Sequence, residues 1–367
     1  MKLKSTELIV GLLVGLLVGT ALGFYLAPHG VAPTLRVTTA GSTTIYPLST
    51  KWAGEYKAVF SSVQVQVSAG GSGVGQTQVA EGIIDIGASS SYPSSSYIAD
   101  NPTVRIIPMA ADALAIIARS DVNGTAGLKL TRSQVISILN GSITTWEAFE
   151  AAWGVSVAAT GTINVYVRSD ASGTTATLTK WLSLGLGWSL GSSESISWPG
   201  LPNFHAVEGN PGVKSGVQGQ AGSIGYVGLA FTTGVTAAVL FNQGNSEWVS
   251  PSPDAAKMAI PSSMVNPGVS LMDSNKTGAY PIVRLLFYLV NTLFLRQSAY
   301  DFIRWCLTTG QDPSWVRTDV GYLEIAGTGA ETLAMSILAS LSPLPGALLL
   351  VSIPPALSED TKRSRTT

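Results

Sequence analysis

Cysteine, histidine and charged residues are all scarce in this sequence. Its 367 residues include one cysteine, Cys306, and two histidines, His29 and His205. A single cysteine excludes a disulfide framework and a thiolate metal cluster, and two histidines without carboxylates at ligand spacing argue against a metal site. Charged residues make up 12% of the chain and the formal net charge is -1, so there is no broad basic surface for a nucleic acid. The composition therefore predicts neither a metal, another cofactor nor a nucleic-acid partner.

Complete catalytic motifs are lacking as well. A nucleotide-hydrolase loop needs Gly-x-x-x-x-Gly-Lys followed by Ser or Thr, but the run Gly70–Gly75 is followed by Gln76. The serine-hydrolase elbow Gly-x-Ser-x-Gly is not completed around Ser72, because Val74 stands at its last position. His205 is the only plausible base, and a lone histidine beside a strand is more often structural. We therefore predict that the protein is not an enzyme.

The N-terminal segment is an uncharged apolar run, from Leu8 to Pro28, that follows Lys2 and Lys4. The run is long enough to cross a bilayer, and the two lysines favour an amino end in the cytoplasm with the body of the protein outside. It lacks both a clean Ala-x-Ala site and a cysteine for lipidation, which favours a retained anchor over a cleaved signal. The sequence thus predicts a protein on the outer face of the cytoplasmic membrane, anchored by or exported through this helix.

The C-terminal tail, residues 343–367, is first apolar and then basic. Its apolar part, 346–357, is short for a membrane span and precedes Lys362, Arg363 and Arg365. A second membrane contact and a disordered or surface-packed tail both remain open.

Three turns rich in glycine and hydroxyl residues each follow an apolar strand and precede a helix. They are 41–44 after the strand 35–40, 69–75 after the strand 63–67, and 169–174 after the strand 165–168. At a helix N-terminus the free backbone N–H groups and the positive dipole end attract anions. Ordinary capping uses the same residue types, but repetition at the carboxyl ends of strands favours an anion site.

Charged and hydroxyl side chains near these turns fit such a site. Arg168 ends a strand, and its guanidinium is a planar fork of donors that suits a tetrahedral oxyanion. Asp170 is expected to accept the remaining guanidinium N–H groups. Three helix ends of roughly +0.5 charge each, together with the arginine, approximately balance a dianion without a metal. The proposed hydroxyl donors are Ser42, Thr43, Thr44, Ser72, Ser172 and Thr174, and a further strand, 83–88, delivers Ser89, Ser90 and Ser91 to a loop.

The alternation of strands and helices predicts an α/β fold of two doubly wound, parallel lobes, since the chain is longer than one core usually serves. Strands are expected at 104–109 and 113–118, the second crossing to the other lobe, and a long strand at 280–290 returns the chain. The expected division is 1–32 signal or anchor helix and linker, 33–112 with 285–342 the first lobe, 113–284 the second lobe, and 343–367 the tail.

Four of these motifs, in this order, resemble the phosphate-binding proteins, the PstS-type substrate-binding components of ABC phosphate importers. The resemblance covers about Arg36 to Glu324, and its carriers are Ala40-Gly41-Ser42-Thr43-Thr44, Gly71-Ser72-Gly73-Val74-Gly75, Asp85-Ile86-Gly87-Ala88-Ser89-Ser90 and Arg168-Ser169-Asp170-Ala171-Ser172-Gly173-Thr174. It implies a periplasmic-binding-protein type II-like architecture, in which lobes joined by crossing strands close over one phosphate and deliver it to an ABC permease.

Carried across position by position, the resemblance implies which residues bind phosphate. They are Thr43 and Thr44 from the first turn, Ser72 from the second, and Arg168, Ser172, Gly173 and Thr174 from the third, with Asp170 pairing the arginine. The family often has an aspartate where this chain has Ser90, and that aspartate accepts the proton of a protonated phosphate. A serine accepts a hydrogen bond but supplies no repulsion, so we expect weaker or differently built selectivity, with Ser89 or Ser90 contributing. Binding of sulfate, molybdate or tungstate, a secreted hydrolase, and an anchored sensor or adhesion module are the alternatives.

Overall fold

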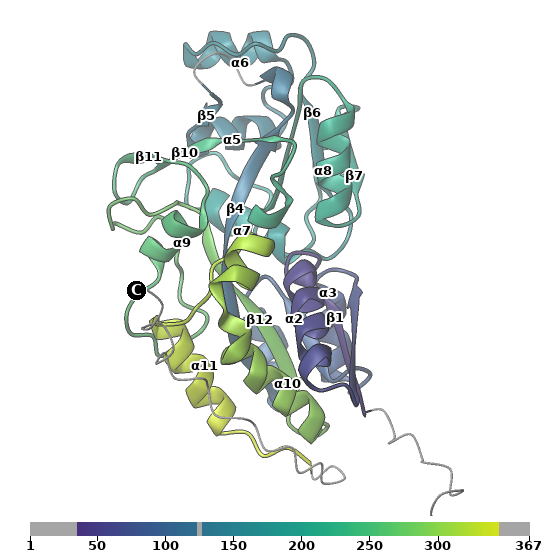
Figure 1. Ribbon diagram of the computed structural model, residues 1–367. Coiled ribbons are helices and arrows are strands. Elements are labelled where there is room, and N and C mark those ends of the chain that lie inside the picture. The colour runs from purple at the N-terminus through teal and green to yellow at the C-terminus, as the bar shows by residue number, and fades with distance from the viewer. Residues whose placement is uncertain (1–34, 123–126, 345–367) are drawn as a thin grey trace, which may run out of the picture. The chain divides into compact units, whose positions relative to one another are not determined.

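The computed structural model describes residues 35–122 and 127–344, in which strands and helices alternate as the sequence predicts (Figure 1). The predicted anchor helix within 1–32 and most of the tail, 345–367, lie outside the described residues. Within the described ranges, no helix has the length and apolar character needed to cross a membrane. From Arg36 onward the described residues belong to one compact unit, and its division into the two expected lobes stays a prediction.

One large mixed sheet forms the centre of this unit. Its strands lie in the order β2 (Val63–Ala69), β1 (Leu35–Gly41), β3 (Ile86–Ser89), β12 (Val283–Asn291), β4 (Val104–Ala118), β8 (Ser223–Gly228), β6 (Asn164–Arg168) and β7 (Phe204–Val207), with β9 (Thr236–Ala237) also paired to β4. A second sheet contains β11 (Glu247–Val249), β10 (Val239–Asn242) and β5 (Lys129–Leu130).

The strand directions differ from the all-parallel expectation at the centre of the large sheet. Parallel pairing holds for β1 with β3 and for β6 with both β7 and β8. However, β12 runs antiparallel to β3 and to β4, and β4 runs antiparallel to β8. The two long central strands therefore join two parallel sections of the sheet.

The strand β4 is continuous, whereas the sequence predicted two strands separated by 110–112. All of its residues except Arg105 are buried, because a central strand is covered on both faces and reads as one apolar run. The lone Asp112 continues the strand because it pairs in register with Arg284 of β12. The antiparallel ladder between β4 and β12 runs from Val104 opposite Asn291 to Ala113 opposite Val283, with one irregularity beside Phe287.

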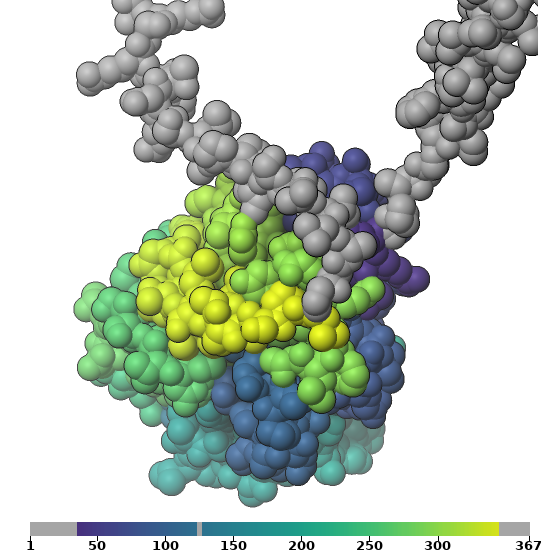
Figure 2. Space-filling view, turned by 90° about the horizontal axis from the view of Figure 1, so that it is seen from below, coloured from purple at the N-terminus to yellow at the C-terminus, as the bar shows by residue number. Residues whose placement is uncertain are grey.

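The described residues also form helices, several of which pack on the large sheet. They are α2 (Tyr46–Val59), α3 (Ser72–Ala80), α4 (Ser95–Asp100), α5 (Arg132–Leu139), α6 (Trp146–Trp153), α7 (Gly173–Leu182), α8 (Gly209–Gly219), α9 (Pro253–Ala259), α10 (Gln297–Leu307) and α11 (Gly329–Ala339), with short 3-10 or π turns at Ser120–Val122, Leu229–Phe231, Thr309–Gln311 and Ser314–Asp319. The helix α11 contacts both α10 and β4, and its yellow atoms spread across the face seen in Figure 2.

The strand β3 is shorter than the predicted strand 83–88. Ile83 is 62% exposed, and Asp85 leaves the sheet pattern to bind other elements. The Asp85 carboxylate accepts from the amide of Thr38 at 2.7 Å, and it forms an ion pair with Arg296. Regular pairing begins only at Ile86, because the preceding residues form a turn fixed by these bonds.

Candidate anion-binding site

The hydroxyl turns predicted from the sequence meet in the structure. The Oγ1 atoms of Thr44, after β1, and Thr174, at the start of α7, lie 2.9 Å apart. Ser72, at the start of α3, and Ser90, after β3, have their Oγ atoms 3.4 Å apart. The buried members of this group are Ser42, Thr43, Thr44, Ser72, Ser89, Ser90, Arg168, Ser172 and Thr174, each at most 7% exposed. Residues from four separate loops thus form one enclosed polar cluster.

Backbone hydrogen bonds fix the loops to one another. The amide of Gly71 donates to the carbonyl of Gly41 at 2.9 Å, and the amide of Gly73 donates to the carbonyl of Ala171 at 3.2 Å. Gly71 has φ +90°, and a Cβ there would lie 2.6 Å from Asp170 Oδ2. Glycine is therefore required at this position both by the backbone conformation and by the close approach of the Arg168 loop.

Arg168 is held rigidly at the end of β6. Its Nε donates to Asp170 Oδ1 at 2.6 Å, and its Nη2 forms an ion pair with Asp170 Oδ2. Its backbone amide donates to the hydroxyl of Tyr226 at 3.2 Å, and burial raises the pKa of Tyr226 to about 12, so this phenol stays neutral. Within the described residues Nη1 has no protein partner. The two N–H groups on Nη1 are therefore free to bind a ligand.

Asp170 is itself held in place by a second contact. Its Oδ1 also accepts from the amide of Gly209 at 3.0 Å, so the carboxylate is fixed from two sides. Burial alone would raise the pKa of Asp170, but the hydrogen bonds and charge of Arg168 outweigh it and hold the pKa below its usual value. The carboxylate is therefore ionised at neutral pH and keeps the guanidinium aligned.

Several hydroxyls in the cluster accept hydrogen bonds from the protein and keep their own hydrogen. Ser72 Oγ accepts from the amide of Ser90 at 3.1 Å, and Ser172 Oγ accepts from the amides of Thr174 and Thr175 at 3.1 and 3.2 Å. Thr43 Oγ1 accepts from both the amide and Nδ2 of Asn210. A hydroxyl has one hydrogen and two lone pairs, so Ser172 and Thr43 are left as donors, whereas one hydrogen of Ser72 and Ser90 is shared in the bond between their two hydroxyls. A buried cluster of hydroxyl donors suits an anion rather than a cation.

Ser42 keeps its hydroxyl hydrogen for a ligand, whereas Ser89 does not. Ser42 Oγ accepts from the amide of Thr44 at 3.1 Å and keeps its hydrogen. The Ser89 hydroxyl donates to the carbonyl of Ser91 at 2.8 Å and accepts from Gln76 Nε2. Its hydrogen is thus already committed, which leaves Ser90 as the better placed donor of the two serines.

A second buried ion pair, which sequence reasoning did not assign to the site, borders the cluster. Arg284 Nη2 lies 2.7 Å from Asp112 Oδ2 and also donates to Thr44 Oγ1 at 3.2 Å, and Arg284 Nη1 donates to the carbonyl of Ser90 at 3.3 Å. Burial raises the pKa of Asp112 against the opposing charge of Arg284. The sequence does contain a signal for this pair, because Asp112 and Arg284 are isolated charged residues in two otherwise apolar stretches. Buried charges are normally paired.

Asn210, on α8, is the other contact that the sequence did not indicate. It is fully buried, and its Nδ2 donates to Thr44 Oγ1 at 2.9 Å while its Oδ1 accepts from the amide of Gly228 at 3.1 Å. Because Thr44 Oγ1 accepts from both Asn210 and Arg284, its hydrogen points to Thr174 Oγ1 and leaves the Thr174 hydrogen free.

Metal-binding and histidine chemistry have no counterpart among the described residues. No group of three or more histidine, cysteine or acidic residues there is arranged to hold a metal ion. His205 Nε2 lies 3.3 Å from Asn164 Oδ1, and the ring packs against Tyr166. In the part of the chain described here, His205 has no hydrogen bond to a serine hydroxyl.

The chain is similar to known proteins over most of its length. A family model described as the PBP superfamily domain matches residues 27–309. The phosphate-binding protein PstS of Xylella fastidiosa strain Temecula1 is 30% identical over 293 residues, which cover 76% of this chain and 79% of that protein. PstS of Methanocaldococcus jannaschii is 28% identical over 314 residues, covering 76% and 80% of the two chains.

A solved structure shares the fold. A putative phosphate ABC transporter substrate-binding protein with bound phosphate, from Clostridium perfringens, superimposes with a TM-score of 0.59 at 23% identity, covering 78% of this chain and 98% of that chain. The two chains thus share a mixed α/β architecture over most of their length. The chain therefore belongs to the PstS phosphate-binding proteins of the PBP superfamily.

Proposed function

We propose that this protein binds inorganic phosphate outside the cytoplasm and delivers it to the permease of an ABC-type phosphate importer. The observation that supports this most directly is the convergence of the free Arg168 Nη1 with hydroxyls that keep their hydrogens. A fully deprotonated or singly protonated tetrahedral oxyanion accepts from all of these groups at once, whereas a carboxylate has too few oxygens to do so.

The anion would lie among Thr43, Thr44, Ser72, Ser90, Arg168 and the first turn of α7. Ser172 caps α7, and the amide of Gly173 begins the helix, so the positive end of the dipole faces the anion. Asp170 would act through the guanidinium without touching the ligand. Each charge-assisted hydrogen bond contributes about 1.5–3 kcal/mol, and the many fixed donors make tight binding attainable because little ordering remains to be done on binding.

Closure of two lobes would bring these donors together. The contact of Thr44 with Thr174, and the close approach of Gly173 to Ser72 and Ser90, join the loops of the expected first lobe to those of the second. Without an anion, the hydrogen-bond donors of the two lobes repel one another, and this repulsion is smaller when the lobes are apart. With an anion bound, donors from both lobes contact it only when the lobes are closed. Binding would therefore shift a hinge equilibrium toward the closed form.

The remaining parts of the proposal concern location. The apolar run from Leu8 to Pro28 would export or anchor the protein at the outer face of the cytoplasmic membrane. The described residues would then face the outside, where phosphate is captured, and no catalytic step is assigned to them.

Another tetrahedral oxyanion is the second candidate, because Ser90 stands where the family often has an aspartate. Isothermal titration of the purified protein with phosphate, sulfate and molybdate distinguishes the two. We expect phosphate to bind most tightly. Stronger binding of sulfate or molybdate would overturn the ligand assignment and leave the fold untouched.

A further inference from the structure

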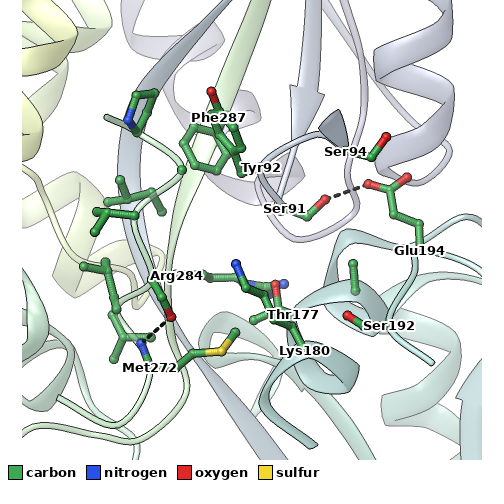
Figure 3. A pocket seen from close by; sticks show the side chains of 18 of the residues that line it. Ser91, Tyr92, Ser94, Thr177, Lys180, Ser192, Glu194, Met272, Arg284 and Phe287 are labelled. Carbon is green, nitrogen blue, oxygen red and sulfur yellow. Dashed lines mark hydrogen bonds between the residues drawn. The ribbon is translucent and has the colours of Figure 1, made fainter. Parts of the chain in front are cut away.

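Glu194 is a carboxylate beside the anion site that no motif indicated. It lies in the segment between α7 and β7, and its carbonyl accepts from the amide of Ser172 at 2.9 Å. Its Oε1 accepts from Ser91 Oγ at 2.6 Å and from Gln76 Nε2 at 2.7 Å. Figure 3 shows the bond between Ser91 and Glu194 at one side of a cavity of about 360 Å³. Glu194 thus bonds three segments that also supply anion-binding residues.

The carboxylate is close to the expected anion position. Ser91 follows Ser90 directly, and Ser172 directly precedes Gly173. A Cβ on Gly73, the residue after Ser72, would lie 3.3 Å from Glu194 Oε2. Glu194 therefore bonds to Ser91 and Ser172, each of which is next to an expected anion-binding residue. Its Oε2 atom also approaches the loop that contains Ser72.

Glu194 differs from the other carboxylates of the site because none of the cationic side chains that the structure describes forms an ion pair with it. Asp170 is paired with Arg168, and Asp112 with Arg284. Among the described residues Glu194 forms no ion pair, and its two bonds come from neutral donors. Two balanced pairs and one unbalanced carboxylate leave the site with a negative charge beside the ligand when Glu194 is ionised.

Other ionisable groups face Glu194 from the surrounding elements. Lys180 of α7 and Arg284 of β12 line the same cavity, and in Figure 3 Lys180 lies apart from the carboxylate. Tyr97 of α4 donates to the carbonyl of Gln76 at 2.7 Å. Burial raises the pKa of Glu194 above its usual value, the bonds from Ser91 and Gln76 lower it, and the charge of Asp170 raises it further.

Resting on the phosphate site proposed above, we propose that Glu194 is a specificity-determining residue that makes the site favour an oxyanion bearing a proton. An ionised Glu194 repels a dianion, and phosphate escapes part of this repulsion because it exists as a singly charged ion near neutral pH. Sulfate cannot bring a proton, so its binding requires that Glu194 take one up from solvent. The proton moves to a carboxylate oxygen of Glu194, and the bound pair then has the same net charge in both cases. Glu194, in the segment before β7, would in this way supply the negative charge that Ser90 lacks.

Glu194→Gln tests the inference, because the amide keeps the size and an acceptor oxygen for Ser91 and Gln76. Phosphate and sulfate binding are measured by isothermal titration at about pH 6 and about pH 8, in buffers of different ionisation enthalpy so that proton uptake is counted. Binding that requires one proton weakens about tenfold per pH unit above the pKa of the group. We expect sulfate binding by the natural protein to weaken at least about tenfold between the two pH values with proton uptake, and sulfate binding by Glu194→Gln to be independent of pH without uptake.

Two further variants complete the experiment. Ser91→Ala removes a bond that favours the ionised carboxylate, so the weakening of sulfate binding shifts to higher pH. Glu147→Gln is the matched control, since Glu147 of α6 is exposed and accepts from the amide of Gly161 at 2.8 Å. This variant should leave the binding of both phosphate and sulfate unchanged. Failure of the natural protein to bind phosphate refutes the proposed function itself. Phosphate binding with identical sulfate profiles in the natural protein and Glu194→Gln refutes this inference alone.

Discussion

Replacing Arg168 by alanine removes a buried guanidinium whose Nη1 has no protein partner among the described residues. Nη1 has two N–H groups without a protein partner among the described residues. Two charge-assisted hydrogen bonds at about 1.5–3 kcal/mol each amount to roughly 3–6 kcal/mol. Because about 1.4 kcal/mol corresponds to a factor of ten, we expect phosphate affinity to fall by about a hundredfold to ten-thousandfold, measured by isothermal titration.

The single variant also leaves Asp170 without its partner. The Asp170 side chain is 11% exposed, and removing one member of a buried ion pair destabilises a protein by about 3–5 kcal/mol. The stranded charge repels the anion as well, so part of the loss would come from Asp170. The double variant Arg168→Ala with Asp170→Asn removes this charge, and its unfolding temperature is expected to lie closer to that of the natural protein.

The double variant shows whether Arg168 itself binds the anion. If Arg168 binds the anion directly, the affinity stays at least about a hundredfold weaker even without the stranded carboxylate. Arg105→Ala is the control, because Arg105 is exposed and its Nη1 donates only to backbone carbonyls. Phosphate binding by the double variant within threefold of the natural affinity would show that the anion lies elsewhere.

Three other substitutions test separate parts of the structure. Gly173→Ala places a Cβ 2.5 Å from Ser72 Oγ and 2.7 Å from Ser90 Oγ, so isothermal titration should show phosphate affinity lowered at least about tenfold. The control Gly54→Ala, whose Cβ has nothing within 4 Å, should leave the affinity unchanged. Equal affinities of the two variants would contradict the close approach of the loops. Ser90→Asp restores the family's carboxylate and should raise the preference for phosphate over sulfate at least about tenfold, and an unchanged ratio would show that Ser90 does not face the anion. For Asp85, burial raises the pKa, but the arginine and threonine bonds outweigh it and lower the pKa, so its stabilisation is present above the unfolded pKa of about 3.9 and is lost as the pH falls through the lower folded value. Asp85→Asn should therefore lower the free energy of unfolding by about 1.5–3 kcal/mol at neutral pH, with the difference shrinking toward about pH 3 in urea titrations, and a difference that is constant with pH would refute this account.

Much of the site could be predicted because it is built from local patterns. The apolar spacing before and after each turn fixed the order of strand, turn and helix around Ser42, Ser72 and Ser172. The side chain of Ser172 caps α7 as its residue type indicates. The pairing of Arg168 with Asp170 spans two residues, so it needs no knowledge of the fold. Such features depend on interactions within a few residues, which a sequence states directly.

Other parts of the site depend on the order of strands in the sheet, which local patterns do not specify. Asp112 and Arg284 are 172 residues apart and meet because β4 and β12 are antiparallel neighbours. The sequence predicted a break in β4 at this aspartate, since an isolated charge in an apolar run cannot be recognised as paired until its partner strand is known. Glu194 reaches Ser91 from a segment without a regular pattern.

The sequence by itself determined the class of fold, the hydroxyl turns at helix starts and the arginine among them, because apolar periodicity and capping act over short distances. Only the tertiary structure decided which hydroxyls keep their hydrogens for a ligand, since that depends on acceptors and donors supplied by Asn210, Arg284 and the neighbouring loops. It also decided where the unpaired carboxylate of Glu194 lies. The selectivity that we propose would rest on these long-range contacts, because the energy of a buried charge is set by the groups that surround it in space.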